Sequence, residues 1–420
     1  MSFETISVIG LGYIGLPTAA MFASRKKKVI GVDVNQRAVD TINQGKIHIV
    51  EPDLDMIVHA AVTEGYLKAT TTPEAADAFL IAVPTPFLPC AEGDIPAPDL
   101  SYIEAASKTI APVLKKGDLV ILESTSPVGA TEQMALWLAE ARSDLTFPQT
   151  YGEEADVNIA HCPERVLPGH VVRELVENDR VIGGLTSKCS ARAVELYKTF
   201  VQGECVITNA RTAEMAKLTE NSSRDVQIAF ANELSIICDK LNIDVWELIS
   251  LANRHPRVNI LQPGPGVGGH CIAVDPWFIV SKTPEEAQII HTARKVNDGK
   301  SDWVIDKIKV AVAEFLLANP NERTQDIDIV FYGIAFKPNI DDIRESPALK
   351  IVEKITEFKL GNIFVVEPNV NELPSSLLHC ELIPNEQANK IKGIHIYLVA
   401  HNEFKYNVPP PNFLSFTSLC

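Results

Sequence analysis

The first half of the chain alternates short apolar runs with segments of helical periodicity. The apolar runs have the length of strands and lie at residues 5–10, 28–33, 78–83, 119–123, 158–162 and 181–182. Strands that alternate with helices are typical of a parallel sheet covered by helices on both faces. The pattern therefore predicts a doubly wound α/β domain.

Helical periodicity without strand patterns occupies the middle of the chain. Residues 210–255 contain neither Gly nor Pro, and their apolar side chains recur at helical spacing. We expect one long helix here, followed by a shorter helix over residues 245–252. A Pro- and Gly-rich loop at residues 263–270 interrupts the pattern, which resumes over residues 284–317.

The last part of the chain returns to strands and helices. A polar segment at residues 319–325 indicates a linker, and the strand patterns IDIVFYG, GNIFVVEPN and IHIYLVA follow it, with a helical pattern at residues 347–358. The predicted fold class is α/β, with two Rossmann-like doubly wound parallel sheets joined by a central helical segment. The expected domains are residues 1–209, 210–318 and 319–420.

Charge and composition narrow the classes of partner. The chain carries 38 Lys and Arg against 54 Asp and Glu, and this net charge of −16 argues against nonspecific binding to nucleic acid or anionic lipid. No apolar stretch is long enough to cross a bilayer, so no membrane partner is expected. A strand pattern that begins at Thr5 leaves no room for a secretory signal, and we expect a cytoplasmic protein.

The eight cysteines are nowhere closer than sixteen positions apart in the sequence, so the chain has no C-x-x-C pair for zinc or redox chemistry. In a reducing compartment most of them should be thiols.

A glycine-rich turn follows the first apolar run. Gly10, Gly12 and Gly15 stand between a strand pattern and a helical pattern, the context in which backbone approaches a pyrophosphate at a helix N-terminus. The second strand pattern ends in Asp33, whose carboxylate can accept hydrogen bonds from adenosine ribose hydroxyls and would repel a 2′-phosphate. The combination favours NAD over NADP, against the alternative of a tight turn that binds nothing.

Hydroxyl groups follow two further strand patterns, in VPTP and ESTSP. Ligands of such sheets bind outside the carboxyl ends of the strands, which places Thr85 and Thr125 well for cofactor or substrate. Turn chemistry alone explains the two segments equally well at this point.

One cysteine has unusual surroundings. Cys271 directly follows the glycine loop, with Asp275 four residues on, and a loop without side-chain bulk suits the close approach of a sugar ring. A thiolate beside a nicotinamide can add to an aldehyde; the adduct then loses hydride to give a thioester, which water opens to an acid. His270 stays unassigned. The remaining cysteines are expected to be small buried hydrophobes: Cys90, Cys162, Cys189, Cys205, Cys238, Cys380 and Cys420.

Polar side chains on the long helix form a second candidate feature. Lys217, Asn221 and Arg224 fall at i, i+4 and i+7 and share one helix face. The face is either a solvated stripe or, if it turns toward Cys271, a source of an ammonium that lowers the thiol pKa and stabilises an oxyanion. Other charged groups that suit a substrate occur in CPERV, HPR, FKP and DDIRES.

Six motifs in one order make the chain resemble the UDP-glucose/GDP-mannose dehydrogenase family of UDP-sugar 6-dehydrogenases. They are GLGYIGLP, STSPVG, CPERVLPG, AKLTENSSRD, HPRVNILQPGPGVGGHCIAVDPW and AFKPNIDDIRESPA, and the match covers about residues 1–369. Within the family the glycine-loop motif is similar to the N-acetylhexosamine branch, since Val274 stands where the UDP-glucose enzymes usually carry a lysine.

The resemblance implies a chemistry and its cofactor. It implies an NAD domain, a central dimer-forming helical segment and a C-terminal UDP-binding domain, in a homodimer without a metal. The implied reaction is a four-electron oxidation at C6 of a UDP-N-acetylhexosamine, from alcohol through aldehyde to acid, with two NAD consumed. The favoured substrate is UDP-N-acetylmannosamine, for the synthesis of enterobacterial common antigen, and UDP-N-acetylglucosamine is the alternative.

The resemblance also implies roles position by position. Cys271 would be the nucleophile, Lys217 the general acid/base or oxyanion partner, and Asn221 a hydrogen-bond donor to the oxyanion. Glu164 and Asp275 would assist hydrolysis, and Thr125 would position water. Contacts to NAD are implied for Tyr13, Ile14, Asp33, Thr85, Ser126 and Arg344. Contacts to the nucleotide sugar are implied for Arg165, Val166, Arg224, His255, Arg257, Gly268, Phe336 and Lys337.

The C-terminus departs from the family. Members usually close with a strand of roughly aspartate, glycine and an apolar residue, whereas this chain ends NVPPPNFLSFTSLC. We therefore expect the last domain either to lack its final strand or to have an altered end, which would weaken nucleotide-sugar binding more than the chemistry.

Two other classes of function compete with a dehydrogenase. A nucleotide-sugar epimerase or dehydratase shares the dinucleotide turn but normally needs a Y-x-x-x-K pair, and none of the eight tyrosines has Lys four positions on. A catalytically impaired protein that binds NAD and a UDP-sugar without turnover has the unusual C-terminus as its only support.

Overall fold

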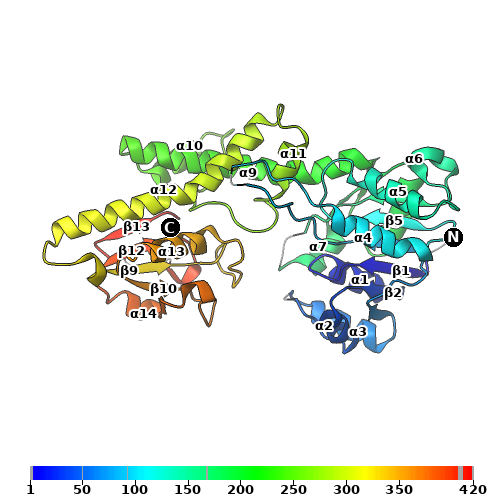
Figure 1. The fold of residues 1–420 in the computed structure, drawn as a ribbon, viewed down its shortest axis with the longest axis horizontal. Coiled ribbons are helices and arrows are strands. Elements are labelled where there is room, and N and C mark those ends of the chain that lie inside the picture. Colours follow the sequence, from blue (N-terminus) through cyan, green and yellow to red (C-terminus); the bar gives the residue numbers. More distant parts are fainter. Residues whose placement is uncertain (1–2, 50, 92, 167–168, 405–409, 419–420) are drawn as a thin grey trace. The chain divides into compact units, whose positions relative to one another are not determined.

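The computed structural model describes residues 3–49, 51–91, 93–166, 169–404 and 410–418. The chain divides into two compact units, Met1–Glu220 and Asn221–Cys420, and the division falls within one long helix. Figure 1 colours the first unit from blue to green and the second from green to red. No helix among these residues is both long enough and apolar enough to span a membrane.

The first unit is built on one sheet in the order β3-β2-β1-β4-β5-β6-β7-β8. All neighbouring strands are parallel except β6 and β7, which pair antiparallel. The six expected strands are present, and β3 and β8 add to the two edges. The strands are β1 Thr5–Ile9, β2 Lys28–Val32, β3 Leu67–Thr70, β4 Ala78–Ile81, β5 Leu119–Leu122, β6 Asn158–His161, β7 Arg180–Gly184 and β8 Cys205–Asn209.

Helices cover both faces of this sheet. They are α1 Gly15–Ser24, α2 Gln36–Asn43, α3 Leu54–Thr63, α4 Ser101–Ile110, α5 Ala130–Ala141, α6 Pro148–Tyr151, α7 Val171–Glu177 and α8 Ser187–Tyr197, with 3-10 turns at Ala111–Val113 and Gly152–Glu154. Successive side chains of β5 point to opposite faces, so Leu119 and Ile121 join one core and Val120 and Leu122 the other. The two cores confirm the doubly wound prediction.

The helical region contains α9 Ala210–Leu241, α10 Val245–Ala252, α11 Asp275–Lys282 and α12 Gln288–Ala318. The long helix and the shorter helix after it confirm the expectation from periodicity. The helix α11 was not expected, because its first residues, Asp275 and Pro276, resemble a continuation of the glycine loop. Pro276 is compatible with a helix there because the first turn needs no backbone donor.

A second parallel sheet closes the second unit in the order β11-β10-β9-β12-β13. Its strands are β9 Asp328–Tyr332, β10 Asn362–Val366, β11 Glu381–Leu382, β12 Ile394–Tyr397 and β13 Phe413–Ser415. Its helices are α13 Pro347–Glu357 and α14 Asn385–Ala388, with 3-10 turns at Thr324–Asp326, Ser375–Leu377 and Asn402–Phe404. Figure 1 shows α12 and α13 beside this sheet, and side chains of all three share one core.

The short strand β13 corrects one expectation about the C-terminus. It pairs parallel with β12 over three residue pairs, from His395 with Phe413 to Tyr397 with Ser415. The last domain therefore does not lack a strand at this edge. The sequence did not reveal this strand, because only three residues form it and prolines precede it.

Candidate active site

The three glycines of the turn between β1 and α1 have two different roles. Gly10 has φ +90°, and a Cβ on it would lie 2.4 Å from the carbonyl oxygen of Ala82. A Cβ on Gly15 would lie 1.8 Å from the carbonyl oxygen of Gly10, whereas one on Gly12 would meet nothing within 4 Å. The first and third glycines thus close the turn, and the second leaves open backbone where a pyrophosphate can approach.

Asp33 follows β2 and holds the same turn. One carboxylate oxygen accepts a hydrogen bond from the backbone N–H of Leu11 at 2.8 Å, and the other accepts one from Asn35 at 2.8 Å. Each oxygen retains a lone pair, so the half-buried carboxylate can also accept ribose hydroxyls. Tyr13 is exposed and Ile14 half-buried at the start of α1.

The carboxyl ends of β4 and β5 bring hydroxyl groups together in the first unit. Ser124 donates to the carbonyl of Val83 at 2.7 Å, which ties the two segments to each other. Ser126 is buried and donates to the carbonyl of Ser124 at 2.6 Å, and Thr125 is half-buried. The buried hydroxyl of Thr85 has no hydrogen-bond partner among the described residues. An unsatisfied buried hydroxyl beside an open glycine turn fits a bound dinucleotide.

Glu164 lies after β6 in a buried ion pair. One carboxylate oxygen pairs with the guanidinium of Arg180 at 2.7 Å, and the other accepts the backbone N–H of Arg165 at 2.7 Å. The guanidinium lies 4.7 Å from the ring centroid of Tyr197 and 5.7 Å from that of Phe200. Arg180 is therefore fixed, and it fixes the orientation of Glu164.

A second buried carboxylate belongs to the same cluster. Glu123 accepts a hydrogen bond from the hydroxyl of Tyr197 at 2.5 Å and lies 3.9 Å from Arg180. Burial raises the pKa of Glu123 to about 7 and that of Cys162 to about 12. Burial lowers the pKa of His161 to about 3, so this side chain is neutral near pH 7. The cluster holds titratable groups whose protonation states are set by exclusion of water.

The N-terminal turns of α9 are anchored to the first unit. Glu214 accepts the backbone N–H groups of Gly129 and Thr131 at 2.7 and 2.8 Å, and the hydroxyl of Thr131 at 2.6 Å. The buried carboxylate thereby caps helix α5, which directly follows the STSPVG segment. Lys217 is half-buried one turn further along α9.

The polar face of α9 continues in the second unit. The amide of Asn221 donates to the carboxylate of Asp275 at 2.5 Å, and the backbone N–H of Asp275 donates to the carbonyl of Cys271 at 2.9 Å. Asp275 is buried at the start of α11, whereas Cys271 is exposed. The structure therefore brings together three of the predicted residues of this unit, and the face of α9 at Asn221 meets the Cys271 segment.

Two glycines of the glycine loop pack so closely against the last domain that a side chain would not fit. A Cβ on Gly268 would lie 2.4 Å from the carbonyl oxygen of Glu345 and 2.6 Å from Cδ of Pro347. A Cβ on Gly269, which has φ +81°, would lie 3.3 Å from the ring of Phe336. Close packing against protein backbone is a reason for these glycines that the sequence did not reveal.

The segment that carries Phe336 and Lys337 is held in place by a buried pair, Glu367 and His401. Glu367 accepts the backbone N–H groups of Ile334 and Ala335 at 2.8 and 3.1 Å and lies 3.1 Å from His401. Hydrogen bonds from these donors lower the pKa of Glu367 despite its burial. Both Phe336 and Lys337 are half-buried.

The remaining predicted side chains are mostly exposed. Arg344 binds Asp342 in a bidentate pair at 2.7 and 2.8 Å, and Arg165 binds Glu220 at 2.5 Å. Arg224, His255 and Arg257 are exposed, and Val166 is half-buried. No group of three His, Cys, Asp or Glu side chains suited to a metal ion occurs among the described residues.

The cysteines follow expectation with one clear exception. Cys162, Cys189 and Cys238 are buried, and Cys205 and Cys380 are partly buried. Cys90 was expected to be buried, and this is wrong: it is exposed in the loop between β4 and α4, where prolines rather than apolar periodicity dominate the sequence. Cys420 lies outside the described residues.

Sequence reasoning missed the residues that hold the others in place. Arg180, Glu123, Glu214 and Glu367 all bind groups that are distant in the sequence. Only Glu214 carried a signal, because it extends the polar face of Lys217 and Asn221 by one turn toward the N-terminus.

Three domains of one family match the chain in order. The NAD binding domain of the UDP-glucose/GDP-mannose dehydrogenase family matches residues 4–201, its central domain residues 211–299 and its UDP binding domain residues 330–413. The glycine turn, Asp33 and the unsatisfied hydroxyl of Thr85 fit the NAD that the first of these domains binds.

Individual relatives cover nearly the whole chain. The UDP-N-acetyl-D-mannosamine dehydrogenase of Yersinia pestis is 68% identical over 96% of this chain and 95% of that protein. The NDP-N-acetyl-D-galactosaminuronic acid dehydrogenase of Ralstonia nicotianae is 63% identical over 96% and 92%. The solved structure of a UDP-D-ManNAc dehydrogenase from Pyrococcus horikoshii has a TM-score of 0.83 at 36% identity, over 98% of this chain and 99% of that one.

These matches confirm the resemblance inferred from the six motifs and the expected fold class. The chain belongs to the UDP-glucose/GDP-mannose dehydrogenase family and is an NAD-dependent oxidoreductase.

Proposed function

We propose that the protein oxidises UDP-N-acetyl-D-mannosamine at C6 to UDP-N-acetyl-D-mannosaminuronate, in two successive oxidations that each consume one NAD. The observation that carries this proposal is the arrangement around Cys271, an exposed thiol joined through Asp275 to the polar face of α9. The name of the relative at 68% identity supports the manno sugar. Synthesis of enterobacterial common antigen is the proposed use of the product.

In the first oxidation, the C6 hydroxyl loses its proton and C6 loses a hydride. NAD, when bound, supplies the hydride acceptor. Lys217 would accept the hydroxyl proton, and its resulting positive charge would stabilise the developing oxygen anion. Asn221 would donate to the same oxygen, because its amide has a second N–H besides the one that donates to Asp275.

In the second oxidation, the thiolate of Cys271 adds to the C6 aldehyde and forms a C–S bond. The oxygen anion of this thiohemiacetal would be stabilised by Lys217 and Asn221. Loss of hydride from C6 would then give a thioester, for which a second bound NAD would supply the hydride acceptor.

Hydrolysis completes the reaction. Thr125 would position a water molecule. Glu164 and Asp275 would accept the two protons that this water loses, one as it attacks the thioester and one as the acid formed ionises to the uronate. The C–S bond breaks, the uronate leaves, and the thiolate of Cys271 is restored. Glu164 suits this role because Arg180 holds one of its carboxylate oxygens and the Arg165 N–H the other, which fixes the orientation of the carboxylate.

The other predicted residues would bind the two ligands. Gly10, Gly12, Tyr13, Ile14, Gly15, Asp33, Thr85, Ser126 and Arg344 are the proposed contacts of NAD. Arg165, Val166, Lys217, Asn221, Arg224, His255, Arg257, Gly268, Phe336 and Lys337 are the proposed contacts of the UDP-sugar.

We also propose a homodimer in the cytoplasm, with domains at residues 1–209, 210–318 and 319–420. Large apolar side chains are exposed on the helices of the second unit, which supports association through them: Phe230, Leu241, Leu251 and Ile289. Neither nucleic acid nor membrane is a proposed partner.

A panel of sugars tests the substrate. The rate of NADH formation would be compared for UDP-N-acetylmannosamine, UDP-N-acetylglucosamine and UDP-N-acetylgalactosamine, since the relative in Ralstonia nicotianae is named for a galacto product. We expect the manno sugar to give the highest kcat/KM. A higher value for either other sugar would refute the substrate and leave the mechanism standing.

Substitution of Cys271→Ser tests the mechanism, with Cys90→Ser as the matched control because both thiols are exposed. The control should retain activity. The Cys271 variant should release no uronate, because a serine hydroxyl at neutral pH is a far weaker nucleophile than a thiolate. Uronate release at the unmodified rate would rule out the covalent route.

A further inference from the structure

We propose that Asn232 and Asn297 are positioning residues for Cys271: they fix the glycine loop of residues 263–270, which Cys271 directly follows, to the helix pair α9 and α12. The proposal rests on the proposed role of Cys271 as nucleophile. Both asparagines are buried between the two helices, and neither was singled out by a sequence motif.

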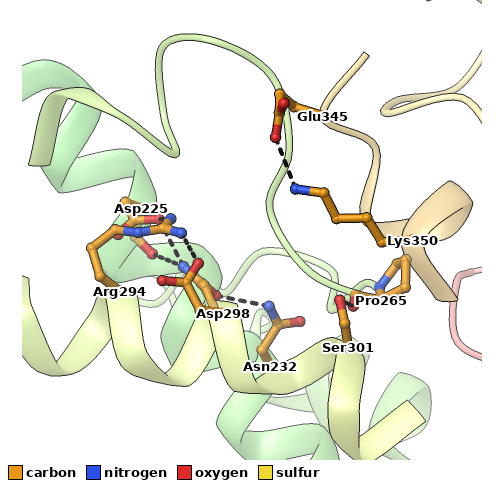
Figure 2. Close-up of polar contacts among 9 residues, drawn as sticks. Asp225, Asn232, Pro265, Arg294, Asp298, Ser301, Glu345 and Lys350 are labelled. Carbon is orange, nitrogen blue, oxygen red and sulfur yellow. Dashed lines mark hydrogen bonds and ion pairs between the residues drawn. The ribbon is translucent and has the colours of Figure 1, made fainter. Parts of the chain in front are cut away.

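The base of this arrangement is a buried ion pair. The guanidinium of Arg294 on α12 pairs with the carboxylate of Asp225 on α9 at 2.6 Å, and it also binds Asp298. Figure 2 shows Asp225, Arg294 and Asp298 gathered where the two helices face each other. Both members of the pair are at most 1% exposed, so the carboxylate of Asp225 can be satisfied only by groups inside the protein.

The ion pair sets the orientation of both amides. Asp225 accepts only, so Asn297 must present its NH₂ group to it, at 2.8 Å. The carbonyl oxygen of Asn297 is thereby turned toward Asn232, whose NH₂ group donates to it at 2.8 Å. The carbonyl oxygen of Asn232 must then point away from Asn297, toward the glycine loop.

This chain of side-chain hydrogen bonds, which runs from Asp225 through Asn297 to Asn232 and is called the relay below, ends on the loop backbone. The oxygen of Asn232 accepts the N–H of Gly264 at 2.9 Å. From the other helix, the hydroxyl of Ser301 donates to the carbonyl of Pro265 at 2.9 Å, a contact drawn in Figure 2. Two successive residues of the loop are therefore held by side chains, one from each helix.

The opposite side of the loop has no room to move. A Cβ on Gly266 would lie 3.0 Å from Pro347 at the start of α13, and Gly268 is tighter still against Glu345. The exposed side chain of Glu345 also pairs with Lys350 of α13 at 2.8 Å, as Figure 2 shows. The loop is thus packed on one side and hydrogen-bonded on the other, and Cys271 is the residue that directly follows it.

The packing of two helices does not require such a relay. Apolar side chains would hold α9 and α12 together at no desolvation cost, whereas this buried polar chain leaves Oδ2 of Asp225 and Nε of Arg294 without a hydrogen-bond partner among the described residues. The relay gives what apolar packing cannot, a directional hydrogen bond to one backbone N–H of the loop. Its consequence is a defined position for the nucleophile relative to C6.

The test compares Asn232→Ala with Ser235→Ala in the full-length protein. Ser235 lies three residues further along α9, accepts a hydrogen bond from Lys300 of α12 at 2.6 Å and donates to the backbone carbonyl of Asn232 at 2.6 Å. Its loss therefore disturbs the same helix pair but leaves the side-chain amide of Asn232 and its bond to Gly264 in place. Ser301→Ala, which removes the contact to Pro265, serves as a milder second variant. Hydrogen exchange of the loop amides, kcat and the KM for NAD would be measured for each.

We expect the loop amides of Asn232→Ala to exchange about tenfold faster, because Gly264 loses its acceptor. The kcat should fall about ten- to a hundredfold, which is the effect expected when a nucleophile is displaced by up to about 1 Å. The KM for NAD should change less than about twofold. Ser301→Ala should shift the same quantities in the same direction by less, and Ser235→Ala should leave loop exchange and kcat unchanged.

Unchanged loop exchange in both loop variants would overturn the proposal, and so would an equal loss of kcat in Ser235→Ala. If the unmodified protein oxidises none of the sugars, the proposed function fails, and loop exchange alone still decides whether the asparagines hold the loop.

Discussion

Lys300→Met is expected to stabilise the second unit at neutral pH. Lys300 lies on α12 and is 2% exposed. Its ammonium donates to the hydroxyl of Ser235 at 2.6 Å and lies 3.6 Å from the ring centroid of Trp303, and neither of these two contacts is with a carboxylate. Burial of this charge lowers the pKa of Lys300 from 10.5 to about 7.

The size of the effect follows from the pKa. One pKa unit corresponds to about 1.4 kcal/mol, so a fall from 10.5 to about 7 represents about 5 kcal/mol of lost unfolding free energy below pH 7. Between pH 7 and 10.5 the unfolded chain holds a proton that the folded protein lacks, and stability therefore rises with pH in this window. The remaining cost is about 3 kcal/mol at pH 8 and vanishes near pH 10.5.

Thermal unfolding of the two proteins from about pH 6 to 10 measures this difference. The advantage of Lys300→Met should be on the order of 10 °C below pH 7 and should shrink steadily as the pH rises. Lys307→Met is the control, because Lys307 is one-third exposed, two turns along α12, and paired with Asp239. An advantage independent of pH, or a less stable Lys300→Met variant below pH 7, would refute the reasoning.

The remaining predictions concern the loop and the buried carboxylates. Gly268→Ala should lower the free energy of unfolding by about 1–3 kcal/mol and also lower kcat/KM, because its Cβ would lie 2.4 Å from the carbonyl oxygen of Glu345. Gly264→Ala should change neither quantity, because open space surrounds that position. Thermal unfolding and steady-state kinetics of both variants measure these effects. Arg180→Met should destabilise the first unit by about 3–5 kcal/mol near pH 8, since it leaves Glu164 buried without its ion-pair partner. Thermal unfolding of Arg180→Met that matches the unmodified protein would contradict the role of Arg180.

The sequence predicted those parts of the fold whose pattern is local. The strand β5 has only apolar side chains over Leu119–Leu122, and α9 has an uninterrupted helical period, so both were recognised. The edge strand β8 was missed because its side chains are largely exposed and give no apolar run. The strand β13 was missed because three residues are too few for a period.

The candidate site divides in the same way. Gly12, Asp33 and Cys271 stand in motifs that carry their own context, so the sequence was enough to select them. Arg180 acts on Glu164, sixteen positions earlier, and Asn232 on Asn297, 65 positions later. Such pairs form only when the helices and strands pack, and no periodicity in the sequence predicts them.

The covalent role of Cys271 is tested by the number of NADH molecules formed for each UDP-N-acetylmannosamine consumed. We expect two NADH and one uronate, because the aldehyde stays bound to Cys271 until it has been oxidised to the thioester, which water then hydrolyses. One NADH for each sugar, with free aldehyde as the product, would contradict the covalent role of Cys271.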